Sequence, residues 1–255
     1  MRVLFLGTGT SVGVPVIGCT CPVCTSTDPR NNRLRVSLYI RTATGFSILI
    51  DTGPDLRQQA LRYGITRVDA VLFTHAHADH IFGMDDLRRF NRDPDHALPC
   101  YADRKTSDSI KSIFGYSMNH RMGGSLPLVH ITEVENAFEL GGVSVVPVPL
   151  KHGRRITTGY RIGGFAYLTD CNAIPQTSLP LLEGLDVLVI DGLRYRPHPT
   201  HFTIPEAIDA IERIGPRHAY ITHLSHEIDH ATVTAQLPDG IELAYDGLDI
   251  TVPSP

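Results

Sequence analysis

Residues 74–80 read Thr-His-Ala-His-Ala-Asp-His and directly follow the apolar run Val71-Leu72-Phe73. Four side chains that can bind a metal ion therefore lie within six residues, separated only by alanine. Imidazole and carboxylate groups are costly to bury unless they are paired or bound to a metal. Together they suit zinc, manganese or iron. The fold must therefore bring further ligands to the end of this apolar segment.

Polar residues also stand at the ends of several other apolar segments. They are Asp51 after residues 46–50, Asp170 after 166–169, Asp191 after 187–190 and His223 after 219–222. Rigid strands that end in such groups can bring several side chains to one point, as a catalytic site requires. Asp51 is expected either to orient a ligating imidazole through its second ring nitrogen or to be an ordinary turn residue.

Short segments rich in Val, Ile, Leu and Phe predict strands along most of the chain. These segments are 2–6, 36–41, 46–50, 69–73, 143–148, 158–162, 165–169, 186–190, 218–222 and 241–245. Helices are predicted at 54–63, 104–114 and 204–214, with Pro54 in a first turn and with Asp103 and Thr203 as N-caps. The pattern indicates an α/β fold in which two sheets pack together beneath helices. No linker or repeat interrupts it, so we expect a single domain over residues 1–255.

The charge balance argues against nucleic acid as a partner. The formal net charge is −4 with histidine neutral, which disfavours a broad basic face. No basic segment and long apolar stretch follow Met1, so no secretory signal is expected. No run of about 18 apolar residues predicts a membrane span. We therefore expect a cytoplasmic protein with no membrane partner.

Three of the five cysteines are crowded together as Cys19, Cys21 and Cys24. This Cys-x-Cys-x2-Cys spacing suits metal binding better than a disulfide framework. A closed tetrahedral zinc site needs a fourth ligand, for which His226 is the candidate. The alternative is a set of free thiols. The loop at about residues 14–30 is thus predicted to hold a structural zinc ion, whereas Cys100 and Cys171 are expected to be small buried hydrophobes.

The motif His75-x-His77-x-Asp79-His80 after an apolar strand resembles the signature of the metallo-β-lactamase superfamily. The order of later matches, His152, Asp170 and His223, supports the resemblance. It implies an αββα sandwich of two mixed β-sheets flanked by helices. It further implies two divalent catalytic metals, Mn²⁺ or Zn²⁺. The first metal would be held by the first two histidines and by His152, the second by Asp79, His80 and His223, with Asp170 between them.

Such a pair of metals predicts a binuclear hydrolase. Two divalent ions about 3.5–4 Å apart repel each other, so an anionic bridge such as Asp170 is needed electrostatically. A hydroxide that bridges both metals is the expected nucleophile, because the metals lower its pKa. Asp79 is counted among the catalytic residues as well as among the ligands.

Two further stretches of sequence point to one family within this superfamily. Residues 7–15, Gly-Thr-Gly-Thr-Ser-Val-Gly-Val-Pro, and the segment Thr222-His223-Leu224-Ser225-His226 are similar to the phosphoribosyl 1,2-cyclic phosphate phosphodiesterase family of the carbon–phosphorus lyase pathway. This similarity implies a small, cyclic phosphodiester as substrate, the structural zinc ion and a homodimer. It also implies His201 as general acid, with His198 as its rival. The chain departs from the pattern at Cys171 beside Asp170, where a thiol is expected to affect the choice of metal, and at residues 104–127, which are expected to shape the substrate pocket.

Other functions on the same fold remain open at this point. One is a nuclease that processes the 3′ end of tRNA, although the sequence has no long basic arm for phosphate binding. Another is a cofactor-biosynthesis protein similar to the pyrroloquinoline quinone pathway member, which can share the cysteine loop. A β-lactamase or a thioesterase leaves the cysteine loop unexplained. A pure binding module would require a disabled metal site, whereas all seven predicted catalytic ligands are present.

Overall fold

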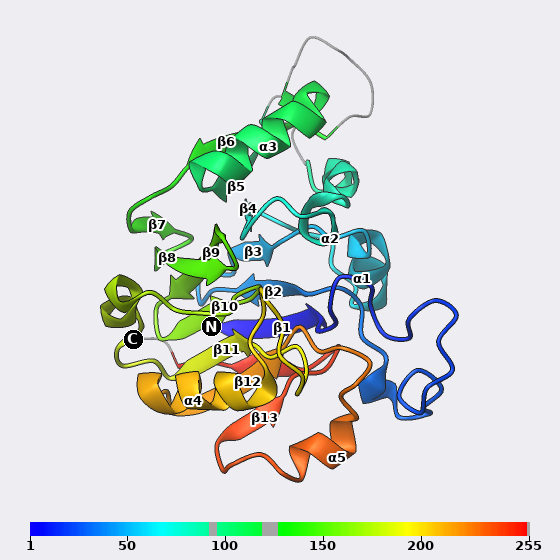
Figure 1. Ribbon diagram of the computed structural model, residues 1–255. Coiled ribbons are helices and arrows are strands. Elements are labelled where there is room, and N and C mark those ends of the chain that lie inside the picture. Colours follow the sequence, from blue (N-terminus) through cyan, green and yellow to red (C-terminus); the bar gives the residue numbers. More distant parts are fainter. Residues whose placement is uncertain (92–95, 119–126, 254–255) are drawn as a thin grey trace.

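Two seven-stranded β-sheets lie face to face and are flanked by helices in a computed structural model that describes residues 1–91, 96–118 and 127–253 (Figure 1). The first sheet contains, in spatial order, β14 (Asp249–Thr251), β1 (Arg2–Gly7), β2 (Ser37–Arg41), β3 (Ser47–Ile50), β4 (Ala70–Leu72), β5 (Leu98–Ala102) and β6 (Val129–Glu133). The second contains β13 (Ile241–Leu243), β12 (His218–Thr222), β11 (Val187–Asp191), β10 (Phe165–Leu168), β9 (Arg155–Ile162), β8 (Val143–His152) and β7 (Phe138–Leu140).

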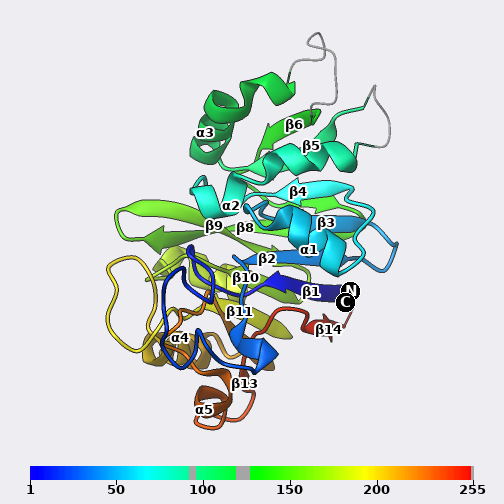
Figure 2. The same ribbon diagram turned by 90° about the vertical axis from the view of Figure 1, so that its right-hand side faces the viewer.

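Helices cover the outer faces of both sheets (Figures 1 and 2). The α-helices are α1 (Leu56–Arg62), α2 (Ala78–Ile81), α3 (Arg104–Phe114), α4 (Ile204–Ile214) and α5 (His230–Thr234). Short 3-10 helices occur at Pro29–Asn31, Met84–Arg89, Gly115–Met118 and Gln176–Leu182. Helices α1 and α3 pack on the first sheet, and α4 and α5 pack on the second. The predicted αββα sandwich is confirmed.

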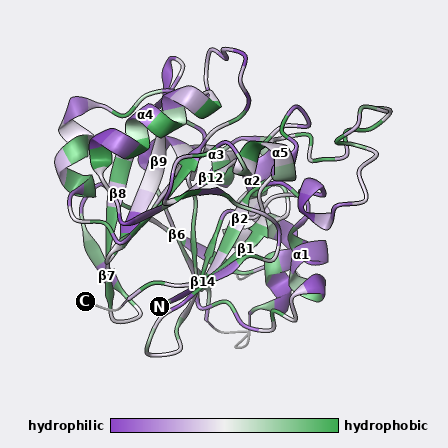
Figure 3. Ribbon diagram, turned by 90° about the horizontal axis from the view of Figure 1, so that it is seen from below, coloured by the Kyte–Doolittle hydropathy of each residue, from purple (hydrophilic) through white to green (hydrophobic). Residues whose placement is uncertain are grey.

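The alternation of side chains along each strand explains the layers. In β1, Val3 and Phe5 enter the core between the sheets, while Leu6 joins the core beneath α1 and α3. In β3, Ile48 and Ile50 face the second sheet and Leu49 faces the helices. Because both faces of these strands are buried, their sequences read as continuous apolar runs. Figure 3 shows hydrophobic residues concentrated in the strands and hydrophilic residues on the outer turns of α1 and α4.

Parallel pairing fixes where the strands end. Strands β3, β4, β5 and β6 pair in parallel, and so do β10, β11, β12 and β13. The carboxyl ends of parallel strands lie at one edge of a sheet, where ligand sites form in open α/β sheets. The residues that follow Ile50, Leu72, Leu168 and Thr222 are therefore carried to common edges of the two sheets. This arrangement places the polar residues singled out in the sequence.

The ten predicted strands are all present, with ends shifted by a few residues. Strands β5, β6, β7 and β14 and the short helices α2 and α5 were not predicted. The predicted caps of α3 and α4 are confirmed, because Asp103 accepts from the backbone of Lys105 and Thr203 forms a capping box with Glu206. Helix α1 begins at Leu56, two residues later than expected, since Pro54 lies in the preceding turn.

None of the helices in the described part of the chain is long and apolar enough to cross a bilayer.

Candidate metal centre

Three non-glycine residues with a left-handed backbone lie at strand ends and turn the chain into the site. Asp51, Asp170 and His223 have φ angles of 61°, 52° and 62°. Asp51 and His223 follow directly on β3 and β12, and Asp170 lies two residues after the end of β10. This conformation costs about 1–3 kcal/mol at a residue other than glycine and persists only where the surroundings impose it. Its occurrence at three residues already suspected from the sequence marks a candidate functional site.

The first donor group contains His75, His77, His152 and Asp170, whose candidate ligand atoms all lie within 4.8 Å of one another. His75 Nε2 is 2.9 Å from His77 Nδ1 and 3.7 Å from an oxygen of Asp170. The first two histidines follow β4, His152 ends β8 and Asp170 follows β10. Both sheets therefore contribute side chains to this group. Its imidazole and carboxylate donors are those that divalent transition metals prefer.

The second donor group contains Asp79, His80, Asp170 and His223, again within 4.8 Å. His80 Nε2 lies 3.2 Å from Asp170 Oδ1 and 3.3 Å from Asp79 Oδ2, and His223 Nε2 lies 3.4 Å from Asp170 Oδ1. The two Nε2 atoms are buried and make no hydrogen bond. Buried polar atoms without a partner are costly unless something else binds them. A metal ion fits this requirement, and Asp170 belongs to both donor groups.

Further hydrogen bonds orient the candidate ligands. Asp51, whose side chain is fully buried, lies 2.7 Å from His80 Nδ1 and also accepts from the backbone and hydroxyl of Thr74. His152 Nδ1 lies 2.8 Å from the carbonyl oxygen of Thr200. Each contact leaves Nε2 of the ring facing the donor groups, as is usual for histidines that bind metals. Asp51 thus has the orienting contact expected from the sequence.

Burial and charge set the protonation of the site. Burial lowers the pKa of His75 well below its ordinary value, and lowers that of His152 to about 4. Both rings are therefore neutral, as metal binding requires. Burial acts in the same direction on His80, but the carboxylates of Asp170 and Asp51 outweigh it and raise the pKa of His80. A cation between these carboxylates and His80 would take the place of that proton.

A third cluster joins Asp191, His201 and His223. Asp191 Oδ2 lies 2.7 Å from His201 Nδ1, and its other oxygen lies 3.8 Å from His223 Nδ1. The ring of His201 stacks on that of His223 with centroids 4.6 Å apart. The sequence placed Asp191 at the end of a strand but assigned it no role. The position of β11 between β10 and β12 places it beside both histidines, and it makes a hydrogen bond with His201.

The structure separates His201 from its rival. The ring centroid of His198 lies 5.0 Å from that of His201, and Nδ1 of His198 is hydrogen-bonded to the hydroxyl of Thr200. His201 is 8% exposed and lies directly against His152 and His223. Burial is the main cause that lowers the pKa of His201. The geometry favours His201 as the residue that meets a substrate, and its role as general acid stays a prediction.

The thiol cluster in the N-terminal loop has the geometry of a zinc site. The sulfur atoms of Cys19, Cys21 and Cys24 lie 3.3, 3.5 and 3.6 Å from His226 Nδ1. Zinc bonds of about 2.3 Å to sulfur and about 2.0 Å to nitrogen in a tetrahedron require about 3.5 Å between these atoms. The backbone N–H of Cys24 donates to Cys21 and is the main cause that lowers the pKa of that thiol to about 6. The four residues therefore fit the structural zinc predicted for this loop.

A buried arginine fastens this loop to the segment that carries His226. Arg33 is 1% exposed and donates to the carbonyl oxygens of Ser225 and Ile228. It also donates to the side chain of Asn31. Burial lowers the pKa of Arg33 to about 10, so the guanidinium remains charged near neutral pH. The loop and the strand end that bears His223 and His226 are thus held as one unit.

Replacing Cys21 with serine is expected to release the structural zinc and to lower the melting temperature by about 5 °C or more, corresponding to ~2 kcal/mol. A serine hydroxyl is not ionised near neutral pH and binds zinc poorly. Thermal unfolding and metal counting by mass spectrometry check the result. Thr20→Ala, an exposed change in the same loop, is the matched control. An unchanged melting temperature together with an unchanged zinc count would exclude a structural site.

Cys171 plays no part in the donor groups of the described residues. Its sulfur lies 3.6 Å from the carbonyl oxygen of Leu168 and packs in the core between the second sheet and α4. Its backbone N–H donates to Asp191. The expected effect of this thiol on metal choice is not supported by its position. The reading of Cys171 as a small buried hydrophobe is confirmed.

Comparison with known proteins identifies the family. The profile described as a β-lactamase superfamily domain matches residues 47–224, which include the seven candidate ligands of the two donor groups. The chain belongs to the β-lactamase superfamily. The predicted superfamily and fold are confirmed, while the ligand roles and the number and identity of the metals stay predictions.

A solved structure, described as a new diphosphatase from the PhnP family, is 44% identical in sequence to this chain. The two structures superimpose with a TM-score of 0.92 over 99% of this chain and 98% of that chain. An octanoyltransferase of Porphyromonas gingivalis is 42% identical over 99% of this chain but 52% of its own length, so the chain spans about half of that relative. A coenzyme PQQ synthesis protein B of Methylobacterium nodulans is 26% identical over 75% of this chain and 73% of that protein.

Proposed function

We propose that this member of the β-lactamase superfamily is a metal-dependent phosphodiesterase that hydrolyses a small, cyclic phosphodiester. The observation that carries the proposal is the pair of donor groups that share Asp170. Two groups with a common carboxylate suit two divalent ions at the separation of about 3.5–4 Å found in two-metal phosphoryl hydrolases. The similarity to a diphosphatase over nearly the whole of both chains supports chemistry at phosphorus.

In such a reaction, different residues of the chain would bind the metals, orient the histidines and donate a proton. Bound divalent ions would supply Lewis acidity and an activated water molecule. The donor groups would hold these ions, while Asp51 orients His80 and Asp191 orients His201. In its imidazolium form, His201 would give a proton to the departing oxygen of the substrate from Nε2, while its Nδ1–H is held by Asp191.

A diphosphate substrate is the second candidate, and the similarity to a diphosphatase favours it specifically. A phosphodiester and a substituted diphosphate both present phosphorus with two non-bridging oxygens to the metals. They differ in the leaving group, which is an alkoxide in the first case and a phosphate in the second. A phosphate leaves without a proton more readily than an alkoxide does. The dependence on His201 therefore distinguishes the two substrates.

The other candidate functions have weaker support. The described residues of this chain contain no inserted basic arm that would hold tRNA. The similarity to coenzyme PQQ synthesis protein B is lower in identity and in coverage than the similarity to the diphosphatase. Octanoyl transfer is the name of a protein about twice the length of the match, so we do not extend it to this chain. A homodimer stays a prediction.

A substrate panel tests the proposed function. The protein loaded with Mn²⁺ or Zn²⁺ is expected to hydrolyse bis-p-nitrophenyl phosphate and a ribose cyclic phosphate, and to leave nitrocefin and a glutathione thioester intact. Removal of the metals with a chelator should abolish the activity, and addition of Mn²⁺ or Zn²⁺ should restore it. A dinucleoside diphosphate measures the second candidate. Activity on the thioester or nitrocefin alone would overturn the proposal.

A further inference from the structure

The loop that carries His201 joins β11 to α4 and spans residues 192–203. Figure 2 shows this loop, in yellow, extending away from the two sheets. Its base is fastened by backbone hydrogen bonds, one of which runs from the N–H of Leu193 to the carbonyl oxygen of Phe202. Residues 195–197 are exposed, so this part of the loop has no core packing to hold it. Its position therefore depends on polar contacts.

The side chain of Arg194 supplies three of these contacts. Its Nε lies 3.3 Å from the carbonyl oxygen of Arg196, and its Nη2 lies 3.4 Å from that of Pro197. Its Nη1 lies 3.4 Å from a carboxylate oxygen of Glu227. A planar guanidinium can donate to several acceptors at once, which the compact ammonium of lysine does less well. Arg194 thus joins the exposed part of the loop to a different segment of the chain.

Glu227 binds a second arginine of the same loop. Arg196 Nη2 and Nε lie 2.7 and 3.0 Å from its carboxylate oxygens. The backbone N–H of Glu227 donates to the hydroxyl of Ser225, whose own N–H donates to the carbonyl oxygen of Leu193. Glu227 also follows directly on His226 of the thiol cluster. Its contacts with the two arginines form a clamp that ties the loop to the segment bearing this candidate zinc ligand.

The end of the clamped loop contacts the candidate metal centre. The carbonyl oxygen of Thr200 lies 2.8 Å from His152 Nδ1, and the next residue is His201. Two residues separate Thr200 from Pro197, whose carbonyl oxygen is bound by Arg194. A shift of the backbone at Pro197 would therefore be passed to Thr200 and His201 over a short distance along the chain.

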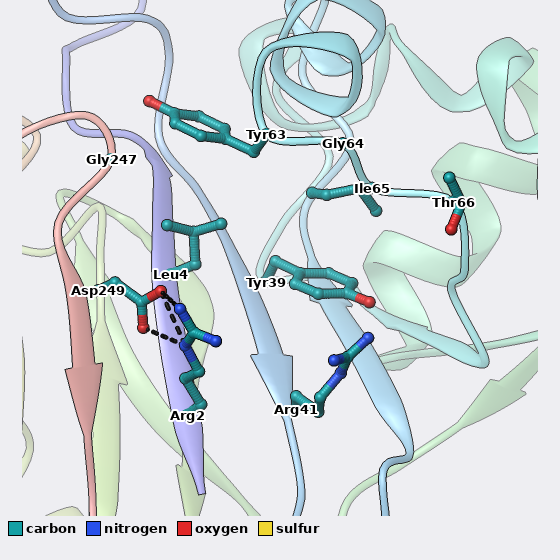
Figure 4. Close-up of a pocket in the computed structure, with 10 residues that line it drawn as sticks. All are labelled: Arg2, Leu4, Tyr39, Arg41, Tyr63, Gly64, Ile65, Thr66, Gly247 and Asp249. Carbon is teal, nitrogen blue, oxygen red and sulfur yellow. Dashed lines mark hydrogen bonds and ion pairs between the residues drawn. The ribbon is translucent and has the colours of Figure 1, made fainter.

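An ion pair at the start of β1 provides a contrast. Arg2 and Asp249 line the hollow in Figure 4, and their side chains are 67% and 28% exposed. Those of Arg196 and Glu227 are 72% and 27% exposed. Exposed ion pairs contribute little to global stability. The pair made by Arg2 joins strands β1 and β14, which already pair through their backbones, whereas the pair made by Arg196 holds an exposed loop.

We infer that Glu227 is a positioning residue, which fixes the loop through Arg194 and thereby sets how well His201 transfers its proton to the leaving group. This inference rests on the proposed function, in which His201 donates that proton. A group that acts in the transition state must be held within about 0.5 Å of its productive position. Glu227 is in none of the donor groups of the catalytic site, so it acts on the loop and not on the metals.

Replacing Glu227 with glutamine is expected to lower kcat about tenfold on a ribose cyclic phosphate but less than about twofold on bis-p-nitrophenyl phosphate, whose leaving group needs no proton. KM for both substrates should change less than about twofold. The zinc count should stay the same, and the melting temperature should change by less than about 3 °C. Asp249→Asn breaks an ion pair of similar exposure and should leave every one of these quantities unchanged.

Equal losses of kcat on the two substrates in Glu227→Gln would overturn the inference, and so would full kcat on the ribose cyclic phosphate. The double variant Arg194→Gln, Glu227→Gln tests whether the two residues act as one unit. It is expected to lose no more kcat than Arg194→Gln alone, because either change opens the same clamp. Losses that multiply in the double variant would contradict the coupling.

Hydrogen exchange separates this inference from the proposed function, because it follows the loop without turnover. In the zinc-loaded protein, Glu227→Gln should speed exchange at least about threefold in peptides that span residues 193–204, and Asp249→Asn should not. Unchanged exchange with full kcat would reject the clamp and leave the phosphodiesterase intact. Faster exchange in a protein that hydrolyses no phosphodiester would support the clamp and overturn the proposed function.

Discussion

Replacing Asp170 with asparagine is expected to reduce kcat by about 10³-fold or more and to remove at least one of the metal ions. The carboxylate of Asp170 is the anion common to both donor groups, lying 3.2 Å from His80 Nε2 and 3.4 Å from His223 Nε2. Without its charge, two divalent ions would repel each other with less compensation. Metal ions supply several kcal/mol of transition-state stabilisation, which corresponds to a change of this size.

The choice of asparagine isolates the charge. Asp170 has a left-handed backbone, which asparagine tolerates better than alanine does. Asp108→Asn, on the exposed face of α3, removes the same charge elsewhere and should have no effect. Metal content is measured by mass spectrometry, and kcat is measured on bis-p-nitrophenyl phosphate. An Asp170→Asn protein with both metals and full turnover would rule out a bridging role.

His201→Ala is expected to reduce kcat about 10²–10⁴-fold on a ribose cyclic phosphate but much less on bis-p-nitrophenyl phosphate. A ribose hydroxyl needs a proton as it leaves, whereas nitrophenolate leaves readily without one. Both metals should remain, since His201 is outside the two donor groups that share Asp170. The ratio of the two losses, measured at saturating substrate, is the informative quantity.

Two further variants test whether the selective loss in His201→Ala reflects proton donation by His201. Asp191→Asn should show the same dependence on leaving group in weaker form, because Asp191 holds His201 Nδ1 at 2.7 Å. His198→Ala should leave both activities near their original values. Equal losses on the two substrates in His201→Ala would reject the acid role. A selective loss in His198→Ala would assign the proton to that residue instead.

The convergence of the candidate ligands could be predicted from the sequence because these residues follow apolar strands. His75 and Asp170 each come directly after or close to a buried segment, and a regular apolar run is a strong local signal. Strand β5 lacked this signal, since it contains Pro99, and β14 has only three residues. Helix α2 was missed for a related reason, because its four residues lie inside the ligand motif.

The roles of other residues depended on contacts that no local pattern contains. Asp191 was noticed at a strand end, but its partners His201 and His223 become evident only when β11 lies between β10 and β12. Lys105 and Arg155 are separated by fifty positions and line one hollow because a helix start and a hairpin meet there. Charged residues in exposed segments carry little sequence signal of their own, so only the tertiary packing shows that they lie together.

The division of ligands between the two sheets has a consequence for the order in which the site can form during synthesis. The first donor group is complete only when Asp170 has left the ribosome, and the second must wait for His223. A nascent chain that has paired strands β1 to β6 therefore presents His75, His77, Asp79 and His80 without their partners, and β14 joins this sheet last. Complete donor groups therefore exist only late in translation, and ions bound there would tie the two sheets together after they have packed.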